Sequence, residues 1–532
     1  MEARPIKWWG WGWEDKRSHL ESRPALLRLF QERLRVDLSG TRPAVSIERI
    51  ALAPSVLSPD ALAEMRQIVG DENVVVRDMD RMSHAGGKGY KDLIRARSGH
   101  FERVPDAVVF PRDEASVRRL LGFAMRQRYA IVPFGGGTSV VGGVTPSDES
   151  DVTITLDLGQ MDRVLDLDGD SGRVTAEAGI RGPALEAALR ERGLTLGHFP
   201  QSWEFSTLGG WIATRAAGSL SNRYGRIDDL VLGVRLVSPV RTLDVRPLPN
   251  ESHGPDLREL ILGSEGTLGV ITQATLRVHP RPPVRRFASR LFRSFADGVA
   301  ALRRMARERA LPDMAYLSDE EETQFAAAGA GRKLADASLL LMEFEGTAAH
   351  VAYGLRVSAK ACAGISRNAG ARPASRWYAE RFEFPYLRDS LLDHGILVDT
   401  VETAVAWSNL ARVYEAGRKA LLDALRRDGS EGLVLCHISH AYPDGASLYY
   451  TFFAPQRVGR EIEQWEEVKA AVTHAFLDAG GALSHHHGIG ADHAPYLRRV
   501  IGEDGVVVLR ALKRELDPNG IMNPGKLITE AP

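Results

Sequence analysis

The chain has 532 residues, of which 44% are apolar and 26% charged, and its net charge at pH 7 is −1. This length exceeds that of one ordinary domain, so we expect a globular protein with two or three domains. The nearly neutral charge gives no indication of nucleic acid as a partner. No segment approaches the roughly 18 to 20 apolar residues that a membrane-spanning helix needs, so any membrane contact is predicted to be peripheral.

Cysteine usage excludes two further classes of protein. The two cysteines, Cys362 and Cys436, are far apart and lack the spacing of a metal site. Neither a disulfide framework nor a zinc ribbon is therefore expected. The beginning of the chain has no apolar signal core, so a reducing cytoplasm is the predicted compartment.

The first hundred residues are predicted to be partly helical and to pack on the body of the protein. They begin with four tryptophans in the segment Pro5-Ile-Lys-Trp-Trp-Gly-Trp-Gly-Trp13. An exposed lipid or partner contact is one interpretation, but large exposed apolar patches are rare, which favours packing. Residues 25–34 and 59–69 are predicted helices.

A β-α-β unit comes next. Residues 106–110 and 130–133 read as strands, and residues 114–128 read as an amphipathic helix that Asp113 can cap. The second strand leads into a glycine-rich run, Pro133-Phe-Gly-Gly-Gly-Thr-Ser-Val-Val-Gly-Gly-Val144. Glycine lets successive N–H groups turn toward a ligand, so this run predicts a cradle for a diphosphate, with a flexible surface turn as the alternative.

This loop does not fit the common nucleotide-binding patterns. In the usual dinucleotide fold the glycines join the first strand to its helix, whereas here they follow the second strand. The run also lacks the Gly-Lys-Ser/Thr ending of a nucleoside-triphosphate loop.

Three later stretches complete a recognisable pattern. They are Gln201-Ser-Trp-Glu-Phe-Ser-Thr207, Thr214-Arg-Ala-Ala217 and Gly263-Ser-Glu-Gly-Thr-Leu-Gly269. With the glycine run they resemble the FAD-binding domain of the vanillyl-alcohol oxidase and p-cresol methylhydroxylase (PCMH) superfamily. The resemblance implies that FAD is bound by Pro133, Phe134, Gly135, Gly136, Gly137, Thr138, Ser139, Gln201, Ser202, Trp203, Glu204, Phe205, Ser206, Thr207, Thr214, Arg215, Ala216, Ala217, Gly263, Ser264, Glu265, Gly266, Thr267, Leu268 and Gly269.

The resemblance also implies an α+β fold with four parts. These are an N-terminal region (1–103), a PCMH-type FAD-binding domain (104–282), an α+β cap or substrate domain (283–475) and a C-terminal segment (476–532). Residues 151–158 and 173–178 are predicted strands, and residues 183–192 a helix, of the FAD-binding domain. In the cap domain, residues 292–310 are predicted as a helix and residues 338–344 and 446–453 as strands.

Three consecutive histidines, His485, His486 and His487, stand in the loop Ser484-His-His-His-Gly-Ile-Gly490. Adjacent side chains do not easily bind one ion, and no organised carboxylate partner is evident in the sequence, so no metal site is predicted. Imidazoles that donate hydrogen bonds or carry protons near neutral pH are the favoured interpretation.

The tryptophan segment, the histidine loop and the strand that contains Tyr449 together resemble the alkyldihydroxyacetonephosphate (alkylglycerone-phosphate) synthase family over nearly the whole chain. The family implies exchange of the acyl group of acyl-dihydroxyacetone phosphate for a long-chain alcohol. This is a step of ether lipid synthesis without net redox change that proceeds through an adduct at flavin N5. The family holds FAD noncovalently.

The resemblance assigns roles to several residues. Tyr449 matches the tyrosine that takes the substrate proton, and the three histidines can assist it, because a free tyrosine titrates near 10. Arg388 matches a substrate-binding arginine, and Thr400 a small hydroxyl residue. His198 is a further expected substrate contact. A surface ion pair of Arg388 with Asp389 or Asp393 is the alternative.

The chain departs from the family at two positions. Gln201 follows His198-Phe-Pro200 where the family tends to have an acidic residue, and Tyr316 stands in place of an arginine. One alternative function is that of an FAD-dependent 2-hydroxy acid dehydrogenase or oxidase. It is less favoured because Asp444-Gly-Ala-Ser-Leu-Tyr449 lacks the asparagine and histidine that such enzymes often carry. A non-catalytic flavin- or lipid-binding protein is the second alternative.

The expected partners are acyl-dihydroxyacetone phosphate and a long-chain alcohol. A long-chain substrate needs an apolar tunnel and access from a bilayer, so we expect a cytoplasmic protein with peripheral membrane contact. A homodimer is left open.

Overall fold

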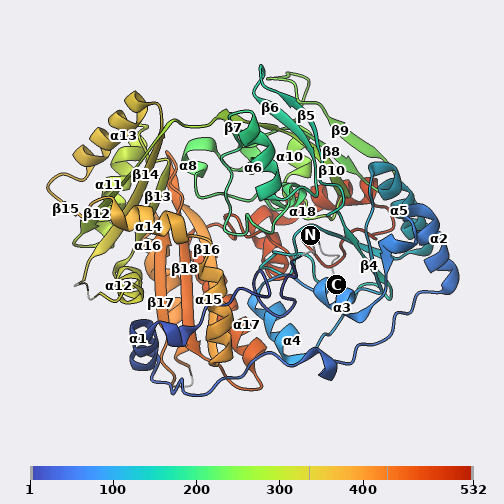
Figure 1. Ribbon diagram of the computed structural model, residues 1–532, viewed down its shortest axis with the longest axis horizontal. Coiled ribbons are helices and arrows are strands. Elements are labelled where there is room, and N and C mark those ends of the chain that lie inside the picture. The colour runs from blue at the N-terminus through green and yellow to red at the C-terminus, as the bar shows by residue number, and fades with distance from the viewer. Residues whose placement is uncertain (1–3, 333, 335, 428, 529–532) are drawn as a thin grey trace. The chain divides into compact units, whose positions relative to one another are not determined.

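The computed structural model describes residues 4–332, 334, 336–427 and 429–528 and divides the chain into two compact units. Unit 1 comprises Met1–Ala44, Ser219–Tyr224 and Arg281–His485. Unit 2 comprises Val45–Gly218, Gly225–Pro280 and His486–Pro532. Both contain helices and sheets, which confirms the predicted α+β class (Figure 1). The predicted four-part division stays a prediction.

Unit 2 contains the predicted β-α-β unit. The strand β2 (Ala107–Val109) leads into α5 (Glu114–Gln127) and then β3 (Ala130–Phe134). Both strands run parallel to β4 (Thr153–Asp157), which lies between them. Asp113 caps the helix as predicted, because its Oδ1 accepts a hydrogen bond of 2.7 Å from the backbone N–H of Ser116. The glycine run begins where β3 ends.

A second sheet of unit 2 has five antiparallel strands in the order β5-β6-β10-β8-β9. Buried aliphatic side chains from this sheet, from β2 to β4 and from α5 form one apolar core. The strands are β5 (Val164–Asp168), β6 (Arg173–Glu177), β8 (Val231–Val237), β9 (Thr242–Val245) and β10 (Val270–Arg277).

Further helices and short strands complete unit 2. The helices are α2 (Pro59–Val69), α3 (Asp78–Ser83), α4 (Tyr90–Ser98), α6 (Gly182–Glu191), α7 (Leu208–Thr214), α9 (Ile227–Leu230), α10 (Arg258–Ile261) and α18 (Ala494–Leu516), and the strands are β1 (Val74–Val75), β7 (Leu194–Thr195) and β11 (His279–Pro280). The helix α18 is kinked at Gly502. After α18 the chain folds back onto β3, where the N–H of Ile131 donates to the carbonyl of Ile521 at 2.8 Å.

Unit 1 is built on one antiparallel sheet of seven strands in the order β15-β12-β14-β13-β17-β18-β16 (Figure 1). The strands are β12 (Val284–Phe292), β13 (Met314–Ser318), β14 (Ser338–Gly346), β15 (Ser366–Asn368), β16 (Ile396–Ala406), β17 (Leu433–Ile438) and β18 (Gly445–Pro455). The helices are α1 (Pro24–Leu34), α8 (Ser221–Tyr224), α11 (Phe295–Arg307), α12 (Glu320–Gly329), α13 (Ala348–Ala361), α14 (Arg372–Glu380), α15 (Phe384–Asp393), α16 (Leu410–Leu425) and α17 (Glu461–Ala479).

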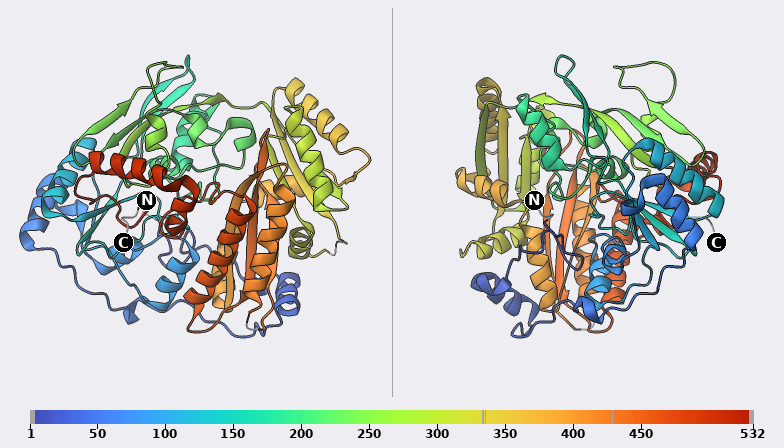
Figure 2. Two further views of the ribbon diagram at one scale, coloured as in Figure 1. Left: turned by 180° about the vertical axis from the view of Figure 1, so that it is seen from behind. Right: turned by 45° about the vertical axis from the view of Figure 1, so that its right-hand side comes forward.

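The two faces of this sheet differ in chemistry because successive side chains of a strand point to opposite sides. On β18, Tyr450 and Phe452 are fully buried on the face that α16 and α17 cover, and the two helices run along the strands (Figure 2). Tyr449 points to the other face. The register aligns it with Glu402 of β16 and with His437 of β17, so three polar side chains form a row across adjacent strands.

One predicted helix differs at both ends from the structure, where α11 spans Phe295–Arg307. The helix predicted over residues 292–310 begins only at Phe295, because Phe292 ends β12 and Ser294 caps α11. The side-chain oxygen of Ser294 accepts a hydrogen bond of 3.2 Å from the backbone N–H of Asp297. Ser294 and Asp297 thus form a capping pair that the apolar pattern of the helix does not reveal.

Candidate active site

The glycine run of unit 2 has the properties of an anion cradle. Among the described residues, the backbone N–H groups of Gly136, Gly137, Thr138 and Ser139 donate no hydrogen bond to a protein atom. Gly137 has a φ of 61°, a conformation that other L-residues rarely adopt. Gly137 is buried, and Gly136, Thr138 and Ser139 are half-buried. Four successive backbone donors without a protein acceptor fit the diphosphate of FAD.

The four predicted cofactor segments meet within unit 2. A Cβ atom on Gly135 would lie 2.1 Å from Oγ1 of Thr207, and one on Gly136 would lie 2.1 Å from the carbonyl oxygen of Phe205. The first segment therefore touches the second so closely that only glycine fits. A Cβ on Gly266 would lie 3.0 Å from Pro133.

The third and fourth segments are also joined. The N–H of Gly263 donates to the carbonyl of Ile212 at 3.0 Å, and the N–H of Glu265 donates to that of Ala213 at 3.0 Å. Arg215 Nε donates to the carbonyl of Leu262 at 3.2 Å. Residues that are distant in the sequence are thus brought into one region, as a single cofactor site requires.

Glu265 connects this region to the Gly-Ile-Gly end of the histidine loop. Its two carboxylate oxygens accept hydrogen bonds of 2.6 Å from the N–H groups of Ile489 and Gly490. Burial raises the pKa of Glu265 to about 7, although the two backbone hydrogen bonds oppose this shift. Asn523 adds a further tie, because its Nδ2 donates to the carbonyls of Glu265 and Gly143. In the same loop, the rings of His486 and His487 lie 4.7 Å apart.

His198 is the predicted substrate residue in unit 2. It is 1% exposed, and among the described residues neither ring nitrogen has a hydrogen-bond partner. The ring packs edge-on against Trp211 at 5.0 Å. Burial, with the nearby charge of Arg226, lowers the pKa of His198 to about 3, so the imidazole is neutral. Its two buried nitrogens are available to a polar ligand, but it brings no positive charge.

Unit 1 places Tyr449 beside two other predicted residues. Burial raises the pKa of the Tyr449 phenol above its ordinary value, whereas its hydrogen bond with Thr400 and the charge of Arg388 lower it. The negative charges of Asp399 and Glu402, which lie on the same strand as Thr400, also raise the pKa of Tyr449. Tyr449 is therefore protonated at neutral pH, next to one cationic and two anionic side chains.

Arg388 lies on α15, which the N-terminal tryptophan segment holds. Asp389 is buried, and its carboxylate accepts a hydrogen bond of 3.0 Å from Lys7 Nζ and others from the N–H of Trp11. A Cβ on Gly10 would lie 2.6 Å from this carboxylate. Asp389 is thus part of a buried network and not of the surface ion pair considered as the alternative for Arg388.

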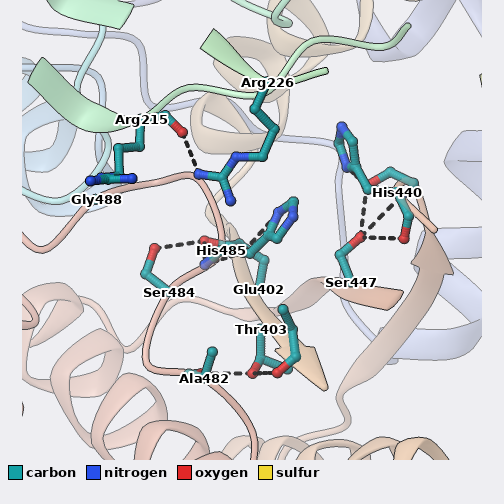
Figure 3. Close-up of polar contacts among 12 residues, drawn as sticks. Arg215, Arg226, Glu402, Thr403, His440, Ser447, Ala482, Ser484, His485 and Gly488 are labelled. Carbon is teal, nitrogen blue, oxygen red and sulfur yellow. Dashed lines mark hydrogen bonds and ion pairs between the residues drawn. The ribbon is translucent and has the colours of Figure 1, made fainter. Parts of the chain in front are cut away.

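His485 is the histidine of the loop that belongs to unit 1. Its N–H donates to both oxygens of Glu402, at 2.9 and 2.8 Å, and Ser484 Oγ donates to the same carboxylate at 2.8 Å (Figure 3). Nε2 of His485 lies 2.5 Å from the hydroxyl of Tyr442. The His440 ring lies 5.0 Å from that of His485, and its Nδ1 lies 2.8 Å from the hydroxyl of Ser439. The backbone N–H of His440 donates to the Ser447 hydroxyl (Figure 3).

The sequence analysis missed Glu402, His437 and Tyr442 at this site. Glu402 had a detectable signal, because a carboxylate inside the apolar strand pattern Ile396-Leu-Val-Asp-Thr-Val-Glu402 is buried at high cost unless it has donors. His437 and Tyr442 had no such signal in the sequence, since their proximity to the predicted residues depends on strand register.

Within the part of the chain that the structure describes, no helix combines the length and the apolar character that a bilayer-spanning segment needs.

Comparisons with known proteins agree with this geometry. Residues 105–242 match the family of FAD binding domains, and residues 281–527 match the C-terminal domain of FAD linked oxidases. The chain thus contains an FAD-binding domain, as predicted. p-Cresol methylhydroxylase with bound substrate has a similar fold, with a TM-score of 0.72 and 14% identity over 90% of this chain and 99% of that one. The predicted PCMH-type fold is confirmed.

More similar proteins share a single name. Alkyldihydroxyacetonephosphate synthase of Dictyostelium discoideum is 35% identical over 512 residues, which cover 91% of this chain and 83% of that protein. A solved structure of an alkyldihydroxyacetonephosphate synthase has a TM-score of 0.86 and 31% identity over 98% of each chain. The chain belongs to the alkyldihydroxyacetonephosphate synthase family.

Proposed function

We propose that the protein exchanges the acyl group of acyl-dihydroxyacetone phosphate for a long-chain alcohol, giving an alkyl ether and a fatty acid without net redox change. The observation that carries this proposal is the placement of Tyr449 against Thr400 and near Arg388 in a chain of this family. A proton donor and acceptor stands there beside a cation that suits a phosphate or a developing oxyanion.

Tyr449 is the proposed acid/base residue. The substrate must lose a proton from the carbon next to its ketone, and the phenolate of Tyr449 accepts it. Because the pKa of Tyr449 is raised, the phenolate is a minor species at neutral pH. The hydrogen bond from Thr400 and the charge of Arg388 stabilise the phenolate when it forms.

Arg388 is the proposed ligand of the substrate's anionic group. A guanidinium offers several N–H donors in a fork that matches phosphate geometry. Thr400 orients the Tyr449 hydroxyl, and His198 contributes neutral hydrogen bonding to the substrate. The histidines 485, 486 and 487 are proposed to carry or stabilise protons, with His485 held through its backbone by Glu402.

FAD is the cofactor, and we propose that it is held noncovalently. The N–H groups of the glycine run would hold its diphosphate, and the segments that meet around Thr207 and Gly266 would surround the rest of it. When bound, FAD supplies an electron-poor ring system that accepts and returns an electron pair. Cytoplasmic location, peripheral membrane contact and a homodimer remain proposals.

Product analysis tests this function. The purified protein is incubated with palmitoyl-dihydroxyacetone phosphate and hexadecanol without an added electron acceptor, and lipids are identified by mass spectrometry. We expect hexadecyl-dihydroxyacetone phosphate and palmitate in equal amounts. If no ether forms, and a 2-hydroxy acid is oxidised when an electron acceptor is added, the protein is a dehydrogenase on this scaffold and the proposal is wrong.

A further inference from the structure

Four aromatic rings stand in line on the polar face of the unit 1 sheet. The Trp377 ring lies 4.7 Å from that of Tyr316, which lies 4.1 Å from that of His437, which lies 4.9 Å from that of Tyr449. The last two pairs are stacked, with interplanar angles of 25° and 21°. Tyr449, the proposed acid/base residue, therefore ends a stack of three rings with His437 and Tyr316, against which Trp377 packs at an interplanar angle of 45°.

Strand register produces this alignment. His437 of β17 pairs with Tyr449 of β18 and, on its other side, with Ser318 of β13. Tyr316 precedes Ser318 by two residues and so points to the same face. Trp377 reaches this row from α14, and α12 contributes Glu322. Residues from β13, β18 and α12 thus contact His437, and Trp377 of α14 extends the row through Tyr316.

Hydrogen bonds fix the His437 ring. Its Nδ1 lies 3.0 Å from both carboxylate oxygens of Glu322 and 2.8 Å from the hydroxyl of Tyr316. The Tyr316 hydroxyl also lies 2.7 Å from the Glu322 carboxylate. Burial and the charge of Glu322 raise the pKa of Tyr316 well above its ordinary value, so its phenol keeps its proton.

These contacts determine where the protons lie. A carboxylate only accepts, so the phenol proton of Tyr316 is donated to Glu322, and the phenol oxygen is left as an acceptor. Nδ1 of His437 then faces two acceptors and must carry a proton itself. Nε2 is the remaining ring nitrogen, and among the described residues it has no hydrogen-bond partner.

We infer that Tyr316, Glu322 and His437 form a positioning unit that holds His437 with its proton on Nδ1 and its ring parallel to Tyr449, leaving Nε2 able to exchange a proton. The tautomer follows from the geometry alone. The claim that this unit supports proton transfer by Tyr449 rests on the proposed function.

Tyr316 is one of the two positions at which the chain departs from the family pattern, and the hydrogen bonds show what tyrosine provides. A phenol donates to Glu322 and at the same time accepts from His437, whereas a guanidinium only donates. An arginine at this position would compete with His437 for the Glu322 carboxylate.

Other titratable groups lie near these rings and enter any pH dependence. Asp399 and Glu402 on β16 and Arg388 on α15 act on Tyr449. Glu322 on α12, Cys436 on β17 and Tyr449 itself act on Tyr316. Because variants at Tyr316 leave the other groups in place, a comparison of variants with the wild type separates their effect.

The tautomer can be tested without substrate. In protein labelled with ¹⁵N-histidine, the His437 signals are assigned by their loss in His437→Gln. We expect Nδ1 of His437 to show the shift of a protonated nitrogen in the wild type, and this preference to weaken in Glu322→Gln. A wild-type spectrum with the proton on Nε2 alone would overturn the assignment.

The support of proton transfer by Tyr449 is tested by single-turnover bleaching of the flavin with palmitoyl-dihydroxyacetone phosphate. Tyr316→Phe removes one hydroxyl. We expect the maximal bleaching rate to fall about tenfold, which corresponds to the loss of one hydrogen bond, with little change in the lipid concentration that gives half of this rate. Tyr316→Arg should lower the maximal rate further. Tyr414→Phe removes a half-buried hydroxyl that donates to Asp319 at 3.1 Å; it is the matched control and should keep the wild-type rate.

The outcomes are distinguishable. Equal rates in Tyr316→Phe and the control, or a faster Tyr316→Arg, would overturn the positioning role while the wild type still turns over. If the lipid does not bleach the flavin of the wild type, the proposed function is wrong, and so is the proposed support of proton transfer by Tyr449. The nitrogen spectrum would still decide whether Tyr316 and Glu322 fix the His437 tautomer.

Discussion

The carboxylate of Glu265 accepts hydrogen bonds of 2.6 Å from the backbone N–H groups of Ile489 and Gly490, although Ile489 lies 224 positions further along the chain. The carboxylate lies in a cofactor segment and fixes the end of the histidine loop. Because it is buried, it stays protonated to a higher pH in the folded protein than in the unfolded chain, where it titrates near 4.5.

This relationship predicts a pH dependence of stability. Between pH 4.5 and about 7 the folded state binds more protons at Glu265 than the unfolded state, so the group's contribution to stability falls as pH rises. In Glu265→Gln that fall is absent. We expect the difference in Tm between variant and wild type, measured by calorimetry, to shift in favour of the variant from pH 5 to pH 7.5. A constant difference would show that Glu265 does not titrate in this range.

The raised pKa of Tyr449 predicts the pH profile of the proton-transfer step. Since the phenol is protonated throughout the neutral range, the phenolate fraction rises about tenfold for each pH unit. The rate of flavin bleaching by acyl-dihydroxyacetone phosphate should therefore rise with a slope near one between pH 6.5 and 8.5. Stopped-flow absorbance measures this rate.

Tyr449→Phe is the companion variant. It should bleach at least about a hundredfold more slowly than the wild type, as expected when a general acid/base is lost. Tyr353→Phe, an exposed tyrosine on α13, is the control. Wild-type kinetics in Tyr449→Phe would exclude this residue as the base.

Arg388→Lys separates a phosphate ligand from a structural arginine. Lysine keeps the charge but loses the bidentate fork, so we expect KM for acyl-dihydroxyacetone phosphate to rise about tenfold or more with a smaller effect on kcat. Arg376→Lys is the matched control, because Arg376 forms an exposed ion pair with Glu380 at 3.0 Å. Unchanged KM in both variants would assign Arg388 to structure only.

The N-terminal segment is predicted to stabilise α15 through one buried ion pair. Lys7 Nζ has no exposed surface and lies 3.0 Å from Asp389. Lys7→Met leaves the carboxylate buried without its cation, which costs about 3 to 5 kcal/mol. We expect faster proteolysis of the N-terminal segment and a lower Tm.

A second substitution shows whether the pair causes this effect. Asp389→Asn in the Lys7→Met background should recover part of the lost Tm, because it removes the uncompensated charge. Additive losses in the double variant would mean that Lys7 and Asp389 do not depend on one another.

The local elements and the cofactor segments could be predicted from the sequence because their signals are local. Glycines that follow a strand, the Asp113 cap and the apolar period of α5 all lie within a few residues of the structure that they specify. The meeting of Gly135 with Thr207 could be expected only through the family resemblance, since nothing in either segment alone names its partner.

The rest of the site depends on long-range register. His437, Tyr449 and Glu402 form a row because β17, β18 and β16 pair in a particular alignment, and a shift by one residue would turn all three side chains to the other face. The role of Tyr316 was hidden for the same reason. The departure from the family pattern at this position can be read from the sequence, whereas the contacts with Glu322 and His437 that explain a tyrosine there cannot.

The central claim is acyl-for-alcohol exchange without net redox change, and an anaerobic absorbance trace of the yellow holoprotein tests it most directly. Palmitoyl-dihydroxyacetone phosphate is added first and hexadecanol second. We predict that the oxidised flavin band bleaches with release of palmitate, and that the alcohol restores it without oxygen or another electron acceptor. A band that the lipid leaves unchanged, or that recovers only when an electron acceptor is admitted, would contradict the claim.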